Sequence, residues 1–352
     1  MDKKYLLVYE KIRDDIEKER IKRGEKLPSK RVCAESLNVS VITVEHAYDL
    51  LSEEGYIQAR EKSGYFVIYS KDTVFSAPAK AEVKITPTDV NNTEPVDFSF
   101  SIYAHTVREV LTDYGEGVLE KSPGKGNLYL REAIRDYLYR SRDTEVSTEQ
   151  IIIGAGAEYL YGLIVQAFGR NVVYGIESPS YAKISDVYGA DGADLEYLKL
   201  GTDGIDSKEL WSAHCNVLHI TPYRSFPSGV TASVSKKREY LNWSVEKNAY
   251  IVEDDFESEF TKSKKPEDTL FSLDEAGRVI YVNTFTKTVS PSVRVAYMLL
   301  PENLVSLFEE KVGFYSCPVP TLEQLIIATL IGNGDFERHI NRVRRRNRNE
   351  EK

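Results

Sequence analysis

Two ionisable residues late in the chain have the types and spacing needed for cofactor chemistry. Lys287 follows the apolar run Val279–Val282, and a lysine placed there can form a Schiff base with an aldehyde in a dry, polar pocket. Asp254 ends an earlier apolar run, where a carboxylate can keep a pyridinium nitrogen protonated as an electron sink. The 33 residues from Asp254 to Lys287 are the length of one strand–helix–strand unit, so we expect both at the same edge of one sheet.

Other residues predict a phosphate site and a ring-stacking group. Arg294, seven residues after Lys287, can clamp a phosphate with two N–H groups. The glycine turn after Ile151–Ile153 opens a helix, and the free backbone N–H groups there suit a phosphate. Tyr181 lies just beyond another strand, where its ring could stack on a cofactor. Taken singly, each of these residues is more often structural, so the prediction depends on their joint occurrence.

The segments that must position these residues read as an α/β domain. From about residue 96, short apolar runs alternate with helical patterns, which favours a largely parallel sheet. The runs are Ile151–Ile153, Val172–Tyr174, Val217–Ile220, Tyr250–Val252, Val279–Val282 and Val295–Leu300. A last helix, Phe336–Arg348, carries five arginines after residue 341. We interpret them as a solvated face, with a second DNA-contacting surface as the alternative.

Residues 1–70 predict a winged helix-turn-helix. Helical spacing over Tyr5–Arg20 is followed by a short helix that starts at Pro28-Ser29, and then by a helix for which Ser40 is a natural N-cap. Two short β-runs around a glycine turn, Tyr56–Arg60 and Tyr65–Tyr69, complete the module. Residues 71–95 are polar, contain three prolines and read as a linker to the domain over 96–352.

The third helix of such a module enters the major groove of double-stranded DNA. At its start, Ser40 and Thr43 can bond phosphates or base edges, and Lys30 and Arg31 can reach the backbone or a guanine. Lys62 lies at the tip of the wing, where it can contact phosphate or the minor groove. The alternatives are a winged helix that binds protein and, for Lys62, a merely solvated charge.

Composition narrows the class of protein. The net charge is −9, but residues 1–70 hold 13 basic and 13 acidic side chains, so this segment is relatively basic on an acidic chain. No apolar run is long enough for a membrane span, and the charged start is not a signal peptide. Three scattered cysteines argue against disulfides or a cysteine zinc site. We therefore expect a cytoplasmic protein with no membrane association and no metal.

Two sets of motifs resemble known families. LPSKR, SVITVEHAYDLLSEEGYI and KSGYFV, in this order, resemble the DNA-binding domain of GntR regulators. Val41 and Glu45 depart from that pattern, because some members have arginines there. GKGNLYLREAI, ESPSYA, ITPYRSFPSG, EDDFESEF and TFTKTVSPSVR resemble the fold-type I aminotransferases that use pyridoxal 5′-phosphate. The combination is similar to a MocR-type transcriptional regulator.

The second resemblance implies roles for particular residues. Lys287 matches the Schiff-base lysine, Asp254 the partner of the pyridine nitrogen and Tyr181 the ring-stacking aromatic. Lys183 falls where some members bind an effector carboxylate. The matches to the phosphate-binding cup are Gly156, Ala157, Thr284 and Arg294.

Several departures bear on activity. Phe256 and Lys121 replace tyrosines that contact the cofactor in the family, and Ala157 replaces a common serine. The chain stops at Lys352, inside a helix, whereas family members continue into a C-terminal subdomain that carries an arginine for the substrate carboxylate. The expectation is an aminotransferase-like domain that lacks most of this subdomain.

The resemblance implies a homodimeric DNA-binding regulator that senses pyridoxal 5′-phosphate or its adduct with an amine or amino acid. Two other functions stay open. One is a pyridoxal-phosphate-dependent aminotransferase with a DNA-binding appendage. The other is a degenerate regulator whose second domain serves only for dimerisation.

Overall fold

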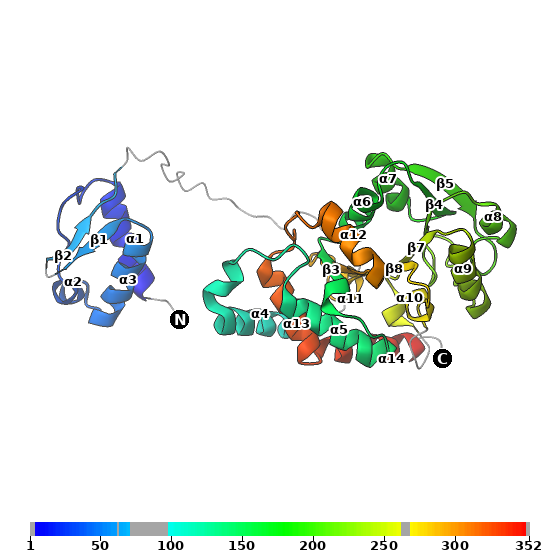
Figure 1. Cartoon of the computed structure of the whole chain (residues 1–352). Helices are drawn as coiled ribbons and strands as arrows, with labels where there is room; N and C mark the ends of the chain where they lie inside the picture. Colours follow the sequence, from blue (N-terminus) through cyan, green and yellow to red (C-terminus); the bar gives the residue numbers. More distant parts are fainter. Residues whose placement is uncertain (1–3, 62, 71–97, 262–267, 350–352) are drawn as a thin grey trace. The chain divides into compact units, whose positions relative to one another are not determined.

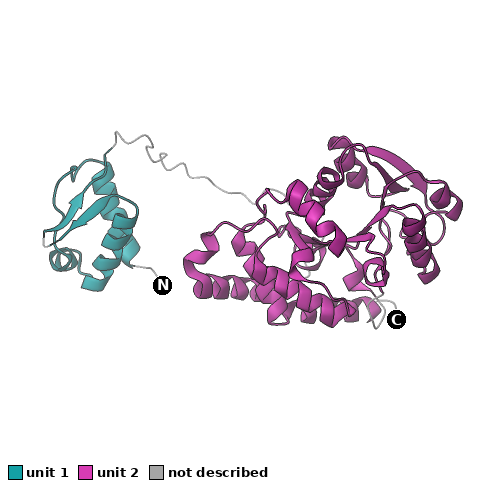
Figure 2. Ribbon diagram, in the orientation of Figure 1, with its two compact units in different colours: residues 1–89 teal, residues 90–352 magenta. Residues whose placement is uncertain are grey.

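A computed structural model describes residues 4–61, 63–70, 98–261 and 268–349. The chain divides into two compact units, residues 1–89 and 90–352 (Figure 2). The linker expected over 71–95 lies outside the described residues, and so does Lys62. The domain boundaries therefore stay a prediction.

Unit 1 is a winged helix-turn-helix, as its sequence predicts (Figure 1). Its hairpin is antiparallel, with Ile57 paired to Val67. The helices bury one apolar face each around Tyr48 and Leu51, which are fully buried. Its elements are α1 (Lys4–Glu17), α2 (Lys30–Leu37), α3 (Val41–Glu53), β1 (Ile57–Arg60) and β2 (Gly64–Val67).

Local polar contacts set the turn between α2 and α3. Asn38 adopts a left-handed conformation (φ 49°), and its N–H bonds the last carbonyls of α2. The hydroxyl of Ser40 then accepts a hydrogen bond from the Thr43 N–H at 3.1 Å, so Ser40 is the N-cap of α3. The expected cap is confirmed, and it fixes where the third helix begins.

Unit 2 is built on a mixed seven-stranded sheet in the order β3-β9-β8-β7-β6-β4-β5. Within the described ranges, β9 runs antiparallel to its neighbours β3 and β8, and the other pairs are parallel. The expected largely parallel sheet is thus confirmed. The strands are β3 (Ile151–Gly154), β4 (Val173–Ser178), β5 (Asp194–Lys199), β6 (Val217–Ile220), β7 (Tyr250–Asp254), β8 (Val279–Thr284) and β9 (Ala296–Leu299).

Strand β5 was not expected from the sequence. Its residues, DLEYLK, mix charged and apolar side chains, because β5 is an edge strand and most of its side chains remain partly exposed. The inner strands β6 and β8, and also the other edge strand β3, are buried beneath helices and are almost wholly apolar, which is why the apolar-run criterion finds them and misses the more exposed β5.

Helices cover both faces of the sheet. On one face, Ile152 and its neighbours pack against α6, α7 and α12. On the other face, Ile151 and Ile153 pack against α4, α5, α13 and α14. The part of this second face formed by β6 and β7 is covered by α8, α9 and α10. None of the helices in the described ranges is long and apolar enough to cross a bilayer. The helices are α4 (Phe100–Tyr114), α5 (Leu128–Arg142), α6 (Ala157–Phe168), α7 (Ala182–Ala190), α8 (Ser207–Ser212), α9 (Val234–Glu246), α10 (Leu270–Leu273), α11 (Phe285–Thr288), α12 (Glu302–Val312), α13 (Thr321–Gly332) and α14 (Asp335–Asn349), with short 3₁₀ turns at Gly115–Leu119, Thr148–Gln150 and Ser258–Phe260.

Candidate functional site

The sheet brings distant segments together at the carboxyl ends of its parallel strands. Thr284, the last residue of β8, pairs with Ala296 of β9, which in turn pairs with Gly154 at the end of β3. Asp254, the last residue of β7, lies beside Val282 of β8. The segments that follow β3, β7 and β8 therefore leave the sheet at one edge, where α/β folds place their ligands.

Asp254 is buried at this edge, where it is hydrogen-bonded to Tyr161 and lies near His219. The Tyr161 hydroxyl, from α6, donates to its Oδ2 atom at 2.6 Å, and His219 Nε2, from β6, lies 3.7 Å from the same oxygen. Burial and the nearby Asp254 carboxylate raise the pKa of Tyr161 well above its ordinary value, so its hydroxyl stays a donor. His219 Nε2 has no hydrogen-bond partner within the described residues. The Asp254 carboxylate is thus oriented by Tyr161. The neighbouring His219 Nε2 atom can still take a hydrogen-bond partner.

Lys287 lies in α11, three residues beyond the end of β8. Its side chain is exposed and borders a pocket of about 210 Å³ together with Arg224, Glu257 and Thr286. Glu257 belongs to the segment after β7, but Asp254 does not line this pocket. The structure thus places Asp254 at the end of β7 and Lys287 just after the neighbouring β8, at the same edge of the sheet.

The phosphate-binding candidates gather at the start of α6. Gly156 caps this helix with φ 92°, and a Cβ atom added there would lie 2.5 Å from Arg294 Nη2, so the arginine uses the space that glycine leaves. Ala157 is the first residue of the helix, where backbone N–H groups lack helical acceptors. Thr284 instead caps α11, because its Oγ1 accepts from the Thr286 N–H at 3.1 Å.

Glu158, which the sequence analysis did not single out, lies among these groups. Its carboxylate accepts a hydrogen bond from Arg294 and pairs with Lys183 Nζ at 3.1 Å. Burial alone would raise the pKa of Glu158, but the hydrogen bonds from Arg294 and Lys183 outweigh it and hold the pKa below its ordinary value. Acidic side chains are common in the first turn of a helix, because the helix dipole stabilises negative charge there. The position of Glu158 in the sequence therefore does not indicate its contacts with Arg294 and Lys183.

Tyr181 is the N-cap of α7 and is 40% exposed. Its ring meets Phe226 edge-on, with 6.0 Å between centroids, and Lys183 Nζ lies 5.9 Å from its centre. Because Lys183 also contacts Glu158, the Tyr181 ring lies next to the start of α6.

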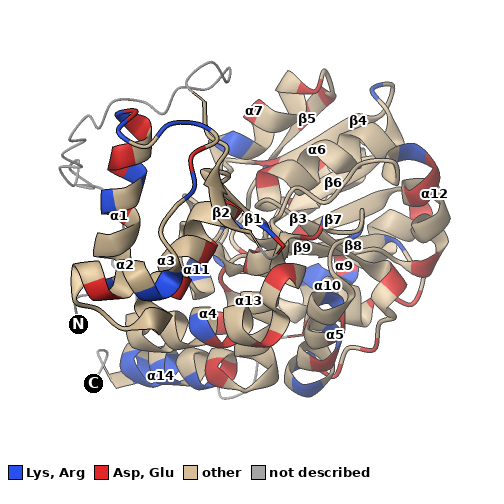
Figure 3. Cartoon of the chain, turned by 90° about the vertical axis from the view of Figure 1, so that its left-hand side faces the viewer, with Lys and Arg blue, Asp and Glu red and all other residues tan. Residues whose placement is uncertain are grey.

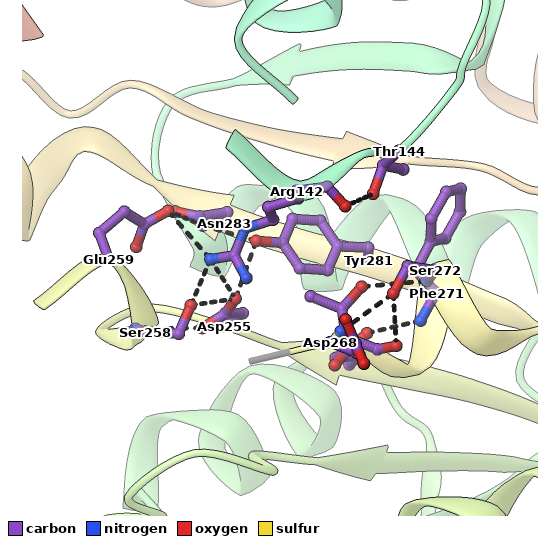
Figure 4. A network of polar contacts seen from close by, with 12 residues as sticks. Arg142, Thr144, Asp255, Ser258, Glu259, Asp268, Phe271, Ser272, Tyr281 and Asn283 are labelled. Carbon is purple, nitrogen blue, oxygen red and sulfur yellow. Dashed lines mark hydrogen bonds and ion pairs between the residues drawn. The ribbon is translucent and has the colours of Figure 1, made fainter. Parts of the chain in front are cut away.

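A buried ion-pair network holds the segments that follow Asp254 and precede Lys287 (Figure 4). Arg142, at the end of α5, lies 3.1 Å from Asp255 and 3.6 Å from Glu259 and also contacts Ser258. The Tyr281 hydroxyl donates to Asp255 at 2.9 Å, and Asn283 donates to Glu259 at 2.7 Å. Burial and then the Asp255 charge raise the pKa of Glu259. This network ties the ends of β7 and β8 to α5 and so fixes the frame of the site.

In unit 1, the predicted DNA-contacting residues differ in their exposure and in their contacts with other side chains. Arg31 is exposed and has no hydrogen bond or ion pair to the described residues, whereas Lys30 is bound to Glu45 at 2.6 Å. The hydroxyls of Ser40 and Thr43 bond each other at 2.8 Å on the exposed start of α3. Lys62 lies outside the described residues. Arg31 is therefore the best-presented cation of the set.

Basic residues run along much of α14 (Figure 3). Arg342 contacts His339 at 2.9 Å, and Arg344 donates to the backbone oxygen of Glu259. Arg342 and Arg345 are exposed, whereas Arg344 is half-buried. Two of these arginines thus support the fold, and the choice between a solvated face and a DNA-contacting face stays a prediction.

Comparison with known proteins gives the same two-part description. Residues 4–67 match the family "Bacterial regulatory proteins, gntR family". The uncharacterized HTH-type transcriptional regulator YdeL of Bacillus subtilis (strain 168) is 32% identical over 97% of this chain and 76% of its own length. The probable rhizopine catabolism regulatory protein MocR of Rhizobium meliloti is 28% identical over 96% of this chain and 73% of its own length.

Among solved structures, the chain is similar to LysN, the α-aminoadipate aminotransferase of Thermus thermophilus, in complex with N-(5′-phosphopyridoxyl)-L-leucine. The TM-score is 0.63 and the identity 27%, over 71% of this chain. The match spans 64% of the aminotransferase chain, somewhat less than two thirds. Unit 2 therefore has the fold of the fold-type I aminotransferases.

Proposed function

The chain belongs to the MocR-type branch of the GntR transcriptional regulators, and on this premise we propose that unit 2 binds pyridoxal 5′-phosphate and makes DNA binding by unit 1 depend on it. Bound there, the cofactor would supply an aldehyde that captures amines and a pyridinium ring that accepts electrons. The similar LysN structure is a complex with a phosphopyridoxyl ligand, which supports the choice of cofactor.

The observation that carries this proposal is the placement of Lys287 and Asp254 at the ends of adjacent parallel strands, at the edge where Arg294 lies over Gly156. Lys287 would hold the aldehyde, and Asp254, oriented by Tyr161, would keep the pyridine nitrogen protonated. The phosphate would bind Arg294 and the N–H group of Ala157, whereas the Gly156 N–H already donates to the Gly154 backbone oxygen at 2.9 Å, so Gly156 would contribute through its missing side chain. The space that glycine leaves at position 156 lets the Arg294 guanidinium approach this turn.

Other residues would complete the site. The exposed ring of Tyr181 would cover one face of the pyridine, and Thr284 would support the phosphate-binding segment through its cap of α11. Lys183 would meet the carboxylate of an amino-acid effector, because it lies beside Tyr181. Phe256 has no hydroxyl with which to bond the ring oxygen of the cofactor, so this contact would be missing.

Regulation requires that the ligand bind two states of the protein with different affinity, since equal binding shifts no equilibrium. We further propose a homodimer, which would present two winged helices to a repeated half-site in double-stranded DNA. In this scheme the contacts of Lys287 and Lys183 would differ with and without a bound amine or amino acid, and that difference would bias the DNA-binding arrangement.

The test is covalent trapping of the cofactor. Purified chain is incubated with pyridoxal 5′-phosphate and reduced with borohydride, and the modified lysine is identified by mass spectrometry. We expect the label on Lys287, its loss in Lys287→Ala, and an altered affinity for operator DNA only in the parent chain. Lys311→Ala, at an exposed lysine paired with Glu310, is the matched control and should label like the parent.

Labelling that persists in Lys287→Ala, or that spreads over surface lysines alone, would contradict the proposal. Rapid amino transfer from an amino acid to a 2-oxo acid by the purified chain would instead favour an aminotransferase that carries a DNA-binding unit.

A further inference from the structure

Glu158 places a carboxylate of the chain among the groups that the proposed function assigns to the cofactor phosphate. Its side chain is 27% exposed and contacts the guanidinium of Arg294, and Lys183 Nζ lies 3.1 Å away. Both cations are more exposed than the carboxylate, at 48% and 56%. Arg294 and Lys183 thus reach inward from two separate segments to meet one anion.

The position of Glu158 on its helix adds to this attraction. It lies in the first turn of α6, which has twelve residues and a glycine cap without a side-chain hydrogen bond. Backbone N–H groups and the helix dipole favour negative charge there, and they are the groups that bind phosphate at helix starts. The Glu158 carboxylate therefore already interacts with the positive groups that a bound phosphate would need.

We propose that Glu158 is an internal anion that competes with the ligand phosphate for Arg294, so that a phosphate ester binds by displacing it. This inference rests on the proposed function and adds a specificity-determining residue to it. When phosphate takes Arg294, the Glu158 carboxylate remains paired with Lys183, the second cation that it already contacts. In the absence of an effector carboxylate at Lys183, the displaced charge therefore keeps one cationic partner.

Competition of this kind selects among ligands. A monoanionic carboxylate offers Arg294 no more charge than Glu158 already provides, whereas a phosphate ester carries up to two negative charges and three acceptor oxygens near neutral pH. The site should therefore discriminate in favour of phosphate esters and bind them less tightly than the same cup without Glu158. The opposite role, in which Glu158 holds Arg294 in place for the ligand, predicts weaker phosphate binding once the carboxylate is removed.

The experiment compares the parent chain with Glu158→Gln, which keeps an acceptor for Arg294 but removes the charge. Inorganic phosphate is titrated by calorimetry, and pyridoxal 5′-phosphate by its absorbance. We expect both to bind about five- to ten-fold more tightly to Glu158→Gln. Pyridoxal, which lacks the phosphate, should bind the two proteins equally.

Two controls locate the effect. Glu149→Gln removes another carboxylate that pairs with two cations, Lys125 and Arg131, at the opposite end of β3, and it should leave phosphate affinity unchanged. Adding Arg294→Gln to Glu158→Gln should abolish the gain in affinity. Equal or weaker phosphate binding by Glu158→Gln would overturn the inference, and so would a gain that survives loss of Arg294.

The two proposals fail separately. If Glu158→Gln gains phosphate affinity but borohydride traps no cofactor on Lys287, the inference stands as a phosphate site and the cofactor proposal is wrong. If the parent chain traps the cofactor on Lys287 and Glu158→Gln binds phosphate no better, the cofactor proposal stands and the competition is refuted.

Discussion

The two units of the chain differ in where they keep their charged side chains. None of the described Asp, Glu, Lys or Arg side chains of unit 1 is buried, and its core is aliphatic and aromatic. Unit 2, by contrast, buries a series of carboxyl groups close to the carboxyl ends of its strands: Glu177, Glu253, Asp254, Asp255 and Glu259.

This difference separates two uses of charge. Surface charges in unit 1 stay available to DNA phosphates and are screened by salt. Buried charges in unit 2 orient loops and are governed by protonation and by their partners, because an unpaired ion in the interior is costly. We therefore expect salt to control what unit 1 does and pH to control the stability of unit 2. Both tryptophans, Trp211 and Trp243, lie in unit 2, so their fluorescence follows that unit alone.

The largest effect is expected from Arg142→Met. The substitution removes the guanidinium between Asp255 and Glu259 and leaves two acidic groups together in the interior. Loss of one partner of a buried ion pair costs roughly 3–5 kcal/mol. Urea unfolding followed by tryptophan fluorescence measures this loss in unit 2.

Arg140→Met is the matched control for this prediction. Arg140 is on the same helix and pairs with Glu337, but its side chain is 51% exposed. An exposed pair contributes about 0–1 kcal/mol. If the two variants lost equal stability, the Arg142 network would not anchor the site.

A second, smaller effect is expected from Glu177→Gln. Burial raises the pKa of Glu177 to about 8, although hydrogen bonds from Ser225 and the Thr221 backbone act to lower it. Between an unfolded pKa near ~4.3 and this value, the folded chain holds a proton that the unfolded chain has lost. The free energy of unfolding should therefore fall as pH rises through this window, by at most about 1.4 kcal/mol per pH unit from this group.

Glutamine does not titrate and still accepts the hydrogen bond that Ser225 donates at 2.6 Å. The dependence on pH should therefore be shallower in Glu177→Gln, as measured by urea unfolding at pH 6 and pH 8.5. Part of the slope should persist, because burial and the Asp255 charge raise the pKa of Glu253 to about 7. Glu246→Gln, at an exposed position of α9, should keep the full slope of the parent. Identical slopes in all three proteins would show that Glu177 is ionised in the folded chain.

The same division explains what could be predicted from the sequence. In unit 1, caps and turns depend on residues three or four positions apart, such as Ser40 and Thr43, so the helix starts were predictable. In unit 2, the apolar runs identified the buried strands, and the end of each strand pointed to Asp254 and Lys287.

The partners of these residues were not predictable, because they come from far along the chain. Tyr161 is 93 positions from Asp254, and Glu158 is 136 positions from Arg294. A tyrosine or a glutamate in a helix carries no local sign of such a contact, which only the sheet order creates. The roles assigned to the site residues remain predictions, whereas the fold and the family are established by the structure and the comparisons.

The smallest effects are expected for DNA binding, where Arg31 and Lys30 should contribute differently to the affinity. Arg31→Ala should weaken binding to a duplex selected by the parent chain about ten-fold, because an exposed guanidinium is lost from the interface. The slope of log affinity against log salt should fall by about one. Fluorescence anisotropy at several salt concentrations measures both. Lys11→Ala, at an exposed position of α1, should change neither.

Lys30→Ala sharpens the comparison, because the ammonium of Lys30 already pairs with Glu45 at 2.6 Å. A phosphate contact by Lys30 would have to replace that ion pair, so its net contribution is smaller, and the loss should be only about two- to three-fold with little change in salt slope. Equal losses for the two variants would mean that Glu45 releases Lys30 on DNA. The Glu45 carboxylate would then not compete with a DNA phosphate for Lys30, in contrast to the competition for Arg294 inferred for Glu158 in unit 2.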